Sequence, residues 1–283
     1  VSGILVGGGY AISQNTFDWL IFSLAVLTTL LFQILSNFAN DYGDGVKGTD
    51  NHERIGPERA FQSGKISKQN FKFGLILTSI LSFISATSLI FIAFGFENAL
   101  MSLTFFVLGL IAIWAAIKYT VGDSAYGYRG FGDVFVFLFF GLVSVCGSYV
   151  LFSKQIDVVI ILAGIGIGLL STAVLNLNNM RDYFSDKNAV KNTLVVMMGQ
   201  LKSKYYHAFL ISIGVIMLVL FYVSAGFSKW VYFSLITVFI LLKHLIFVIK
   251  NREPKNLDQE LKKVALSTFG IALIFFLVQN FLV

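Results

Sequence analysis

Two acid-rich segments carry the side chains of this sequence that are best suited to chemistry. NFANDYGDGVKGTD runs from Asn37 to Asp50 directly after an apolar stretch. LNLNNMRDYFSDK runs from Leu175 to Lys187 and again leaves an apolar stretch. In both segments an asparagine stands four residues before an Asp-Tyr pair. The repetition predicts two matched acidic clusters.

The polar residues of each cluster are spaced to share one face of a helix. They are Asn37, Asp41 and Asp44 in the first cluster, and Asn178, Asp182 and Asp186 in the second. Gly43 and Gly45 weaken a helix within the first cluster, so we expect that cluster at a fraying helix end.

Carboxylates gathered in one cavity repel one another unless cations lie between them. Magnesium suits these acids best, because it takes hard oxygen ligands, few from the protein, and completes its shell with phosphate oxygens. Calcium would need a denser cage of ligands than these spacings offer. The expected metal ligands are Asp41, Asp44, Asp182 and Asp186.

Basic side chains accompany the acids, which suits a complex of magnesium with a diphosphate. Arginine pairs with phosphate oxygens through two bonds, and lysine acts as a mobile charge. Arg59 is the expected catalytic cation, and the expected substrate-binding residues nearby are Asn37, Asn40, Lys47, Asn178, Arg181 and Lys191. The alternative is that these cations only mark the cytoplasmic side of a membrane protein.

The elements that position these residues are apolar helices. Hydrophobic residues make up 57% of the 283 and charged residues 13%, which is far from the composition of a soluble domain. Apolar runs of about 20 residues indicate membrane-spanning helices rather than the shorter alternating strands of a barrel. We expect spans near 19–40, 71–94, 98–119, 133–152, 158–179, 205–226, 230–249 and 262–283.

The apolar segment Val1 to Ile12 is too short to cross a membrane. We interpret it as part of a first helix, which gives an all-α integral membrane protein of nine transmembrane helices with the first truncated. A cleaved signal peptide is the alternative, but no basic region precedes the segment. The whole chain, 1–283, is expected to form a single transmembrane domain of two pseudo-repeated four-helix halves.

All but two of the 21 Lys and Arg residues fall in alternate loops, the exceptions being Lys154 and Lys229. The positive-inside rule makes the basic loops cytoplasmic, near 41–70, 120–132, 181–204 and 250–261. Both acidic clusters then open to the cytoplasm. Nucleic acid is not an expected partner, because the charges lie in short loops without stacking platforms.

Other reactive residue types lack a pattern. His52, His207 and His244 have no metal-ligand spacing, and lone Cys146 in an apolar run favours core packing. The third inner loop holds the candidates for binding a second substrate: Lys118, Tyr119, Asp123, Tyr126, Arg129 and Asp133. Asp133 has an equal alternative as a charge favoured at a helix N-terminus.

Three blocks resemble those of UbiA-superfamily prenyltransferases, most closely the branch that prenylates 1,4-dihydroxy-2-naphthoate in menaquinone synthesis. They are NFANDYGDGVKGTDNHERIGPERAFQSGKIS (37–67), GYRGFGDVFVFLFFG (127–141) and NNMRDYFSDKNAVKNTL (178–194). The resemblance implies magnesium-dependent transfer of a polyprenyl group from its diphosphate to an aromatic acid, with loss of carbon dioxide, at the cytoplasmic face of a bacterial inner membrane.

The resemblance places the first aspartate-rich motif on Asn40, Asp41 and Asp44, and the second on Asp182 and Asp186. Where many relatives have a third acid, this chain has Gly48, followed by Asp50. Two alternatives stay open: a relative that uses 4-hydroxybenzoate or homogentisate, and a metal or organic-anion transporter. Uncharged span centres argue against the transporter, because ion-coupled transport usually needs ionisable groups near the midplane.

Overall fold

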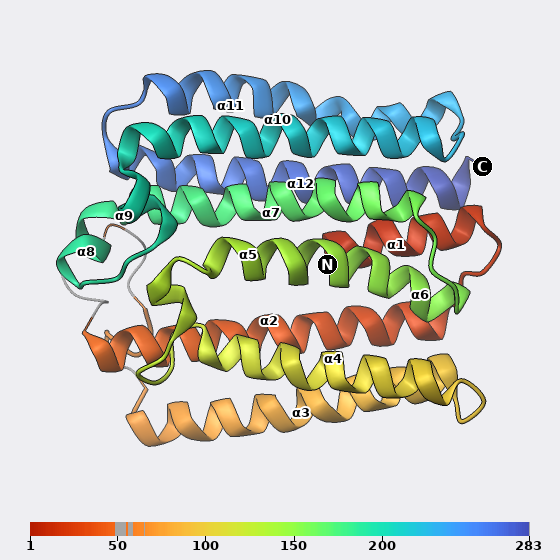
Figure 1. Cartoon of the computed structure of the whole chain (residues 1–283), viewed down its shortest axis with the longest axis horizontal. Helices are drawn as coiled ribbons and strands as arrows, with labels where there is room; N and C mark the ends of the chain where they lie inside the picture. Colours follow the sequence, from red (N-terminus) through yellow and green to blue (C-terminus); the bar gives the residue numbers. More distant parts are fainter. Residues whose placement is uncertain (49–54, 56–58, 65, 283) are drawn as a thin grey trace. The chain divides into compact units, whose positions relative to one another are not determined.

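The computed structural model describes residues 1–48, 55, 59–64 and 66–282 (Figure 1). The part of the chain so described is helical and contains no strand. Its long helices are α2 (Trp19–Lys47), α3 (Lys68–Phe94), α4 (Ala99–Lys118), α7 (Val159–Arg181), α10 (Gln200–Ser224), α11 (Val238–Lys250) and α12 (Leu257–Phe281). The expected all-α class is confirmed.

Shorter elements connect or extend these helices. Five are α-helical: α1 (Ser2–Ser13), α5 (Gly132–Val136), α6 (Ser148–Ser153), α8 (Tyr183–Asn188) and α9 (Leu194–Met198). Three are 3₁₀ helices, η1 (Tyr126–Arg129), η3 (Lys229–Thr237) and η4 (Pro254–Asn256), and η2 (Phe137–Gly147) is a π-helix.

Within the described residues, eight helical stretches are long and apolar enough to cross a membrane. They correspond to the eight spans expected from the apolar runs, and the chain is a multi-pass membrane protein. The segment Val1–Ile12 also forms a helix, α1, which has 12 residues and is mostly buried. At about 1.5 Å per residue it is shorter than the ~30 Å hydrocarbon core of a bilayer.

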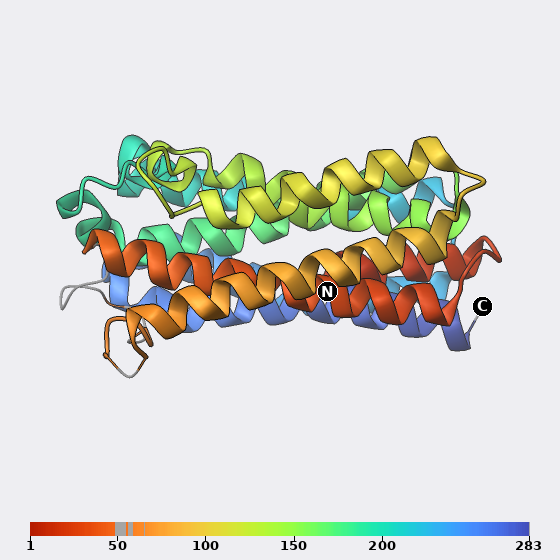
Figure 2. The ribbon, with the colours of Figure 1, turned by 90° about the horizontal axis from the view of Figure 1, so that it is seen from below.

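The chain divides into two compact units. Unit 1 comprises Val1–Phe22, Asp133–Arg181 and Gly199–Val283, and unit 2 comprises Ser23–Gly132 and Asp182–Met198. In unit 1, α7 lies beside α10 and α12, and in unit 2, α3 lies beside α4 (Figures 1 and 2). These units differ from the two sequence halves suggested by the repeated acids, and the single-domain assignment stays a prediction.

Small residues let α1 pack tightly within unit 1. A Cβ on Gly3 would lie 2.1 Å from Ser144 Oγ, and a Cβ on Gly7 would lie 2.0 Å from Ser148 Oγ. Both distances are far below van der Waals contact, so only glycine permits this approach. Such close backbone packing stabilises helix pairs in lipid, where burial of apolar surface contributes little.

Three helices of unit 1 are joined by a chain of buried polar groups, here called the histidine chain. His207 Nε2 on α10 lies 2.7 Å from His244 Nε2 on α11, and His244 Nδ1 lies 2.6 Å from Glu260 Oε2 on α12. Glu260 also accepts a hydrogen bond from Lys263. His207 and His244 are therefore held in a buried hydrogen-bonded network between helices, and His52 lies outside the described residues.

One boundary and one helix type differ from expectation. We expected a loop through residue 261, but α12 begins at Leu257 and therefore carries Glu260 inside the helix. The π-helical turns of η2 were not foreseen, because hydropathy does not distinguish π from α geometry. Cys146 lies half-buried in η2, with Sγ 3.8 Å from the carbonyl oxygen of Ile160, which fits a packing role.

The orientation of the spans can be tested by labelling. Single cysteines replacing the exposed residues Lys187 and Lys255 should react only from the cytoplasmic side of sealed vesicles, and those replacing Lys154 and Lys229 only from the other side. The reason is the concentration of basic residues in alternate loops. Reaction of a cysteine at position 154 from the cytoplasmic side would reverse the assigned topology. Cys146 is replaced by Ser in all variants to remove background.

Candidate active site

The first acidic cluster lies on α2, which continues without interruption to Lys47. The acids of the cluster therefore lie in the last two turns of the helix, as expected, but the helix does not end at Gly43 or Gly45. A Cβ on Gly43 would lie 2.5 Å from Thr120 Oγ1, and a Cβ on Gly45 would lie 2.2 Å from Phe61 Cδ1. These glycines allow other segments to approach the helix closely, and Asp41 and Asp44 keep the shared face that their spacing predicted.

The second acidic cluster does not lie on one helix, contrary to expectation. The helix α7 ends at Arg181, and Asp182 stands at the start of the separate helix α8. Its carbonyl oxygen accepts hydrogen bonds from the Asp186 amide at 2.8 Å and from Ser185 Oγ at 2.9 Å. The short helix α8 therefore fixes Asp182 relative to Asp186, and both are buried.

Lys191 joins the two clusters within unit 2. Its Nζ lies 3.4 Å from Asp44 Oδ2 and 3.7 Å from Asp186 Oδ1. The backbone leads it there through Val190, whose φ of 57° is unusual for a β-branched residue. Conformations of this kind cost about 1 to 3 kcal/mol and persist where the surrounding structure imposes them.

Asp44 has partners on both of its carboxylate oxygens. Oδ2 lies 3.4 Å from Arg59 Nη1 as well as from Lys191, and Oδ1 accepts a hydrogen bond of 2.8 Å from the Tyr128 hydroxyl. Arg59 Nε also lies 3.7 Å from Asp41 Oδ1. Arg59 and Lys191, both chosen from the sequence, are thus brought to the acids.

Tyr128 is a member of this group that the sequence reasoning missed. Besides its bond to Asp44, its ring has Lys47 Nζ at 4.0 Å and Lys191 Nζ at 5.3 Å from the centroid. Ammonium groups at these distances are attracted to the face of an aromatic ring. The available signal was its position in the GYRGFG block, where the neighbouring Tyr126 and Arg129 were selected instead.

The electrostatics of the group reflect its burial and its charges. Burial raises the pKa of Asp186 to about 6, with Asp182 and Asp44 adding to the rise and Lys191 opposing it. Burial also disfavours a charged Lys191, but Asp44 and Asp186 outweigh it and raise the pKa of its ammonium. The acids repel one another, and the cation between them is held in its charged form.

The donor set of this group fits magnesium. Asp41, Asp44, Asp182 and Asp186 offer only oxygen ligands, and the mutual repulsion felt at Asp186 is what a divalent cation would relieve. Among the described residues, no three acids, histidines or cysteines converge as a ready-made metal site. A magnesium ion held here would thus take much of its shell from phosphate and water, as magnesium commonly does.

Two further residues of the first cluster occupy different environments. Asn40 Oδ1 lies 3.5 Å from Thr120 Oγ1, and the same hydroxyl donates to the Ala39 carbonyl at 2.9 Å. Asn37 is exposed and accepts a bond from Gln33 Nε2 at 3.2 Å. Gly48 has a φ of 72°, and Asp50, the candidate replacement for the third motif acid, lies outside the described residues.

Arg181 and Asn178 form a separate group in unit 1. Arg181 Nη2 donates to Asn178 Oδ1 at 2.8 Å, and Nη1 pairs with Asp258 Oδ1 at 2.7 Å. These contacts tie the end of α7 to the start of α12. They favour an anchoring role for Arg181, and its role in substrate binding stays a prediction.

The candidates for binding a second substrate do not form one cluster. The Tyr119 and Tyr126 rings lie 5.4 Å apart in unit 2, near the end of α4 that carries Lys118. Arg129 and Asp123 are exposed. Asp133 belongs to unit 1, where it stands in the first turn of α5 and accepts a bond of 3.3 Å from Tyr206. The alternative of a charge at a helix N-terminus therefore suits Asp133.

A family model described as the UbiA prenyltransferase family matches residues 1–277. The chain belongs to the UbiA prenyltransferase family. It is accordingly an enzyme, an aromatic prenyltransferase, as the resemblance of its acidic motifs implied.

Curated members of the UbiA family align with most of the chain. A 1,4-dihydroxy-2-naphthoate octaprenyltransferase of Haemophilus influenzae is 45% identical, covering 94% of this chain and 86% of the relative. The protein of the same name from Escherichia coli is 40% identical, covering 98% of this chain and 89% of the relative. That from Mycobacterium leprae is 34% identical, covering 78% of this chain and 72% of the relative. The alignments extend well beyond the acidic motifs.

Proposed function

We propose that this UbiA-family enzyme transfers a polyprenyl group from polyprenyl diphosphate to 1,4-dihydroxy-2-naphthoate, with loss of carbon dioxide. The product would be demethylmenaquinol, a step of menaquinone biosynthesis. The proposal places the site at the cytoplasmic face of a bacterial cytoplasmic membrane. Relatives at 45% and 40% identity carry the name of this activity.

The observation that carries the proposal is the meeting of both acidic clusters at Lys191. Asp44 and Asp186 come from distant segments and lie 3.4 Å and 3.7 Å from the same ammonium. Arg59 adds a second cation at 3.4 Å from Asp44. Alternating carboxylates and cations suit a diphosphate with its metal, because each negative oxygen can find a positive partner.

The reaction makes one carbon–carbon bond and breaks two bonds. The ring carbon that bears the carboxylate attacks the allylic carbon as the carbon–oxygen bond to the diphosphate breaks and its electron pair leaves with the diphosphate. The bond to the carboxyl group then breaks, its electrons restore the aromatic ring, and carbon dioxide leaves. Bound magnesium would neutralise charge that develops on the departing diphosphate.

The residues of this chain would supply positive charge to the diphosphate and would hold it in position. Arg59 and Lys191 can donate hydrogen bonds to diphosphate oxygens, and Tyr128 holds Asp44 through its hydroxyl. Lys47 lies 4.0 Å from the Tyr128 ring centroid and can supply a further positive charge. Positioned charges of this kind lower the barrier most when they face charge that grows in the transition state.

Two alternatives differ from the proposal in defined ways. A UbiA-family enzyme with another acceptor, such as 4-hydroxybenzoate or homogentisate, would keep the diphosphate site and change only the acceptor. A metal or organic-anion transporter would move a solute without forming a product. The family membership argues against transport, and flux through proteoliposomes without prenylated product would favour it.

The acceptor can be tested with carboxyl-labelled 1,4-dihydroxy-2-naphthoate. Membranes containing the protein and a defined polyprenyl diphosphate should release labelled carbon dioxide in a 1:1 ratio with the prenylated naphthoquinol measured by mass spectrometry. The reason is that the attacked carbon bears the labelled group. A parallel panel of aromatic acids serves as the comparison. Label retained in the product, or turnover of 4-hydroxybenzoate alone, would contradict this acceptor and leave the family assignment intact.

A further inference from the structure

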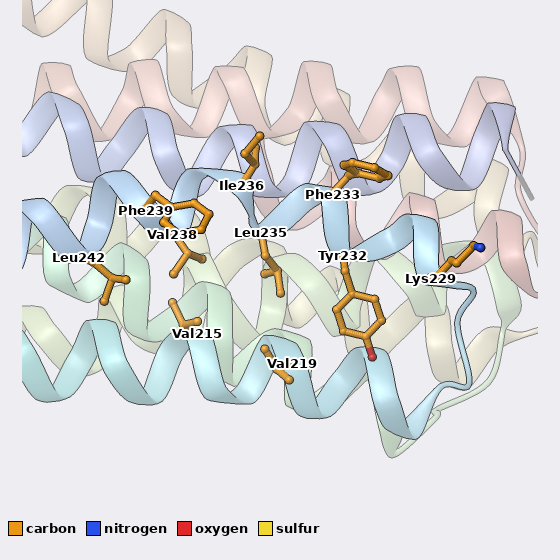
Figure 3. Close-up of a pocket in the computed structure, with 10 residues that line it drawn as sticks. All are labelled: Val215, Val219, Lys229, Tyr232, Phe233, Leu235, Ile236, Val238, Phe239 and Leu242. Atoms are coloured by element: carbon orange, nitrogen blue, oxygen red, sulfur yellow. The ribbon is translucent and has the colours of Figure 1, made fainter.

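The longest 3₁₀ segment among the described residues borders an apolar groove in unit 1. The helix η3 runs over nine residues, Lys229–Thr237, whereas 3₁₀ helices rarely exceed three or four. The groove has a volume of about 540 Å³ and lies between α10 and the run formed by η3 and α11 (Figure 3). Ligand sites commonly have volumes of about 300 to 1,000 Å³.

The 3₁₀ geometry makes the groove straight. With three residues per turn, side chains three apart lie directly in line. Lys229, Tyr232 and Leu235 of η3 have this spacing and line the groove, and Val238 at the start of α11 continues the row. Phe233 and Ile236 form a second row of this spacing within η3, and Phe239 and Leu242 of α11 line the groove beyond it. In an α-helix such a row would wind around the axis, so the 3₁₀ geometry keeps the groove straight along η3.

The opposite side of the groove belongs to α10. Val215 and Val219 point from α10 toward Leu235 and Val238 in Figure 3, and both valines are half-buried. Their small side chains leave the space between the helices that a larger residue would fill. The floor is thus apolar along its length, which suits a hydrocarbon chain.

Charge is confined to one end of the groove. Lys229 is the only Asp, Glu, Lys or Arg between residues 205 and 242. Across the part of the chain that the structure describes, it makes no ion pair, and its Nζ lies 5.5 Å from the centre of the Trp230 ring. A lysine beside tryptophan and tyrosine at the end of a span is typical of the membrane interface. The exposed ammonium therefore complements an anion at the level of lipid headgroups.

The length of the groove is close to the hydrocarbon thickness of one membrane leaflet. From Lys229 to Thr237 the helix η3 covers about 16 Å at ~2.0 Å per residue. Half of a ~30 Å hydrocarbon core is about 15 Å. A polyprenyl chain of many five-carbon units is far longer than this, whereas a phospholipid acyl chain is confined to one leaflet.

We propose that this groove binds one anionic phospholipid, with an acyl chain along the Lys229–Val238 row and the phosphate at Lys229. The site is separate from the residues placed in prenyl transfer, and it does not depend on the proposed function. By the basic-loop pattern it belongs to the leaflet opposite the basic loops. The lipid would fill the space between α10 and η3 that the valines leave open.

The test uses the full chain in vesicles with Trp230 as the reporter. Trp19 and Trp114 are replaced by Phe, so that all tryptophan fluorescence comes from position 230. The vesicles contain equal amounts of phosphatidylglycerol and phosphatidylcholine. In one preparation the phosphatidylglycerol carries a doxyl quencher at carbon 5 of an acyl chain, and in the other the phosphatidylcholine carries it. The quenching of Trp230 fluorescence is compared between the two preparations.

Labelled phosphatidylglycerol should associate with Trp230 about fivefold more strongly than labelled phosphatidylcholine, the preference that one lysine at a membrane surface gives. Lys229→Gln should remove this preference. Lys154→Gln, at the other basic residue outside the basic loops, should leave it unchanged. Val219→Phe, which fills the groove and keeps the lysine, should also remove it.

Three outcomes would contradict the proposed lipid site. The first is equal association of the two lipids with the unaltered groove. The second is a preference that survives Val219→Phe, because it would then reflect surface charge alone. The third is displacement of phosphatidylglycerol by an equimolar long-chain polyprenol, which would assign the groove to isoprenoids. Circular dichroism of each variant confirms that helical content is retained, and the readout is independent of prenyl transfer.

Discussion

Replacing Asp44 by Asn should lower prenyl transfer about 100-fold or more, the loss expected when an oriented charge is removed from a metal or transition-state site. The amide keeps the shape of the side chain and can still accept the bond that Tyr128 donates at 2.8 Å. It lacks the charge that a divalent cation needs. The variant should still fold and insert, because Lys191 keeps Asp186 as its acidic partner, while it fails in catalysis.

The measurement is product formed per folded protein across a series of magnesium concentrations, with product identified by mass spectrometry. The wild-type protein should lose activity in chelator and regain it with magnesium. Glu97→Gln is the matched control, because Glu97 is an exposed acid in the α3–α4 turn of the same unit. Near-normal turnover of Asp44→Asn at limiting magnesium would refute the two-cluster metal site.

Replacing Lys191 by Gln should destabilise the protein in the absence of substrate and metal by about 3 kcal/mol or more, because breaking a buried ion pair leaves an uncompensated charge. Lys191 is buried and neutralises Asp44 and Asp186 at 3.4 Å and 3.7 Å. Thermal unfolding of the purified protein should show a lower apparent Tm. Lys187→Gln is the control, because Lys187 is exposed four residues earlier.

Two additions make this prediction specific to charge. The double variant Lys191→Gln with Asp44→Asn should recover part of the lost Tm, because one of the uncompensated carboxylates is gone. Magnesium should reduce the difference in apparent Tm between Lys191→Gln and the wild-type protein, because it supplies positive charge at the position of the lost ammonium. A Tm that neither change affects would mean that Lys191 acts only through packing.

The spans could be predicted because a bilayer imposes a length on apolar runs. The end of α2 could not, because helix propensities near Gly43 and Gly45 amount to about 1 kcal/mol each and tertiary packing overrides them. Thr120 and Phe61 provide that packing, from segments that local sequence cannot relate to α2.

The acids and cations of the site were identifiable because their residue types and spacing are unusual at a membrane surface. The contact of Tyr128 with Asp44 was not, because it joins residues 84 positions apart. The break at Asp182 was missed for another reason. Asn178, Asp182 and Asp186 keep a helical spacing in sequence, but the chain leaves the helix between α7 and α8.

The histidine chain has a consequence for the order in which the fold is completed. Glu260 faces His244 Nδ1, which therefore donates to the carboxylate, and neutral His244 must then accept at Nε2 from His207. One carboxylate on α12 thus selects the tautomers of rings on α10 and α11. Synthesis proceeds from the N-terminus, so α10 and α11 precede their acidic partner. Polar groups within a bilayer are costly until they pair, and the arrival of α12 fixes the rotation of both earlier helices about their axes.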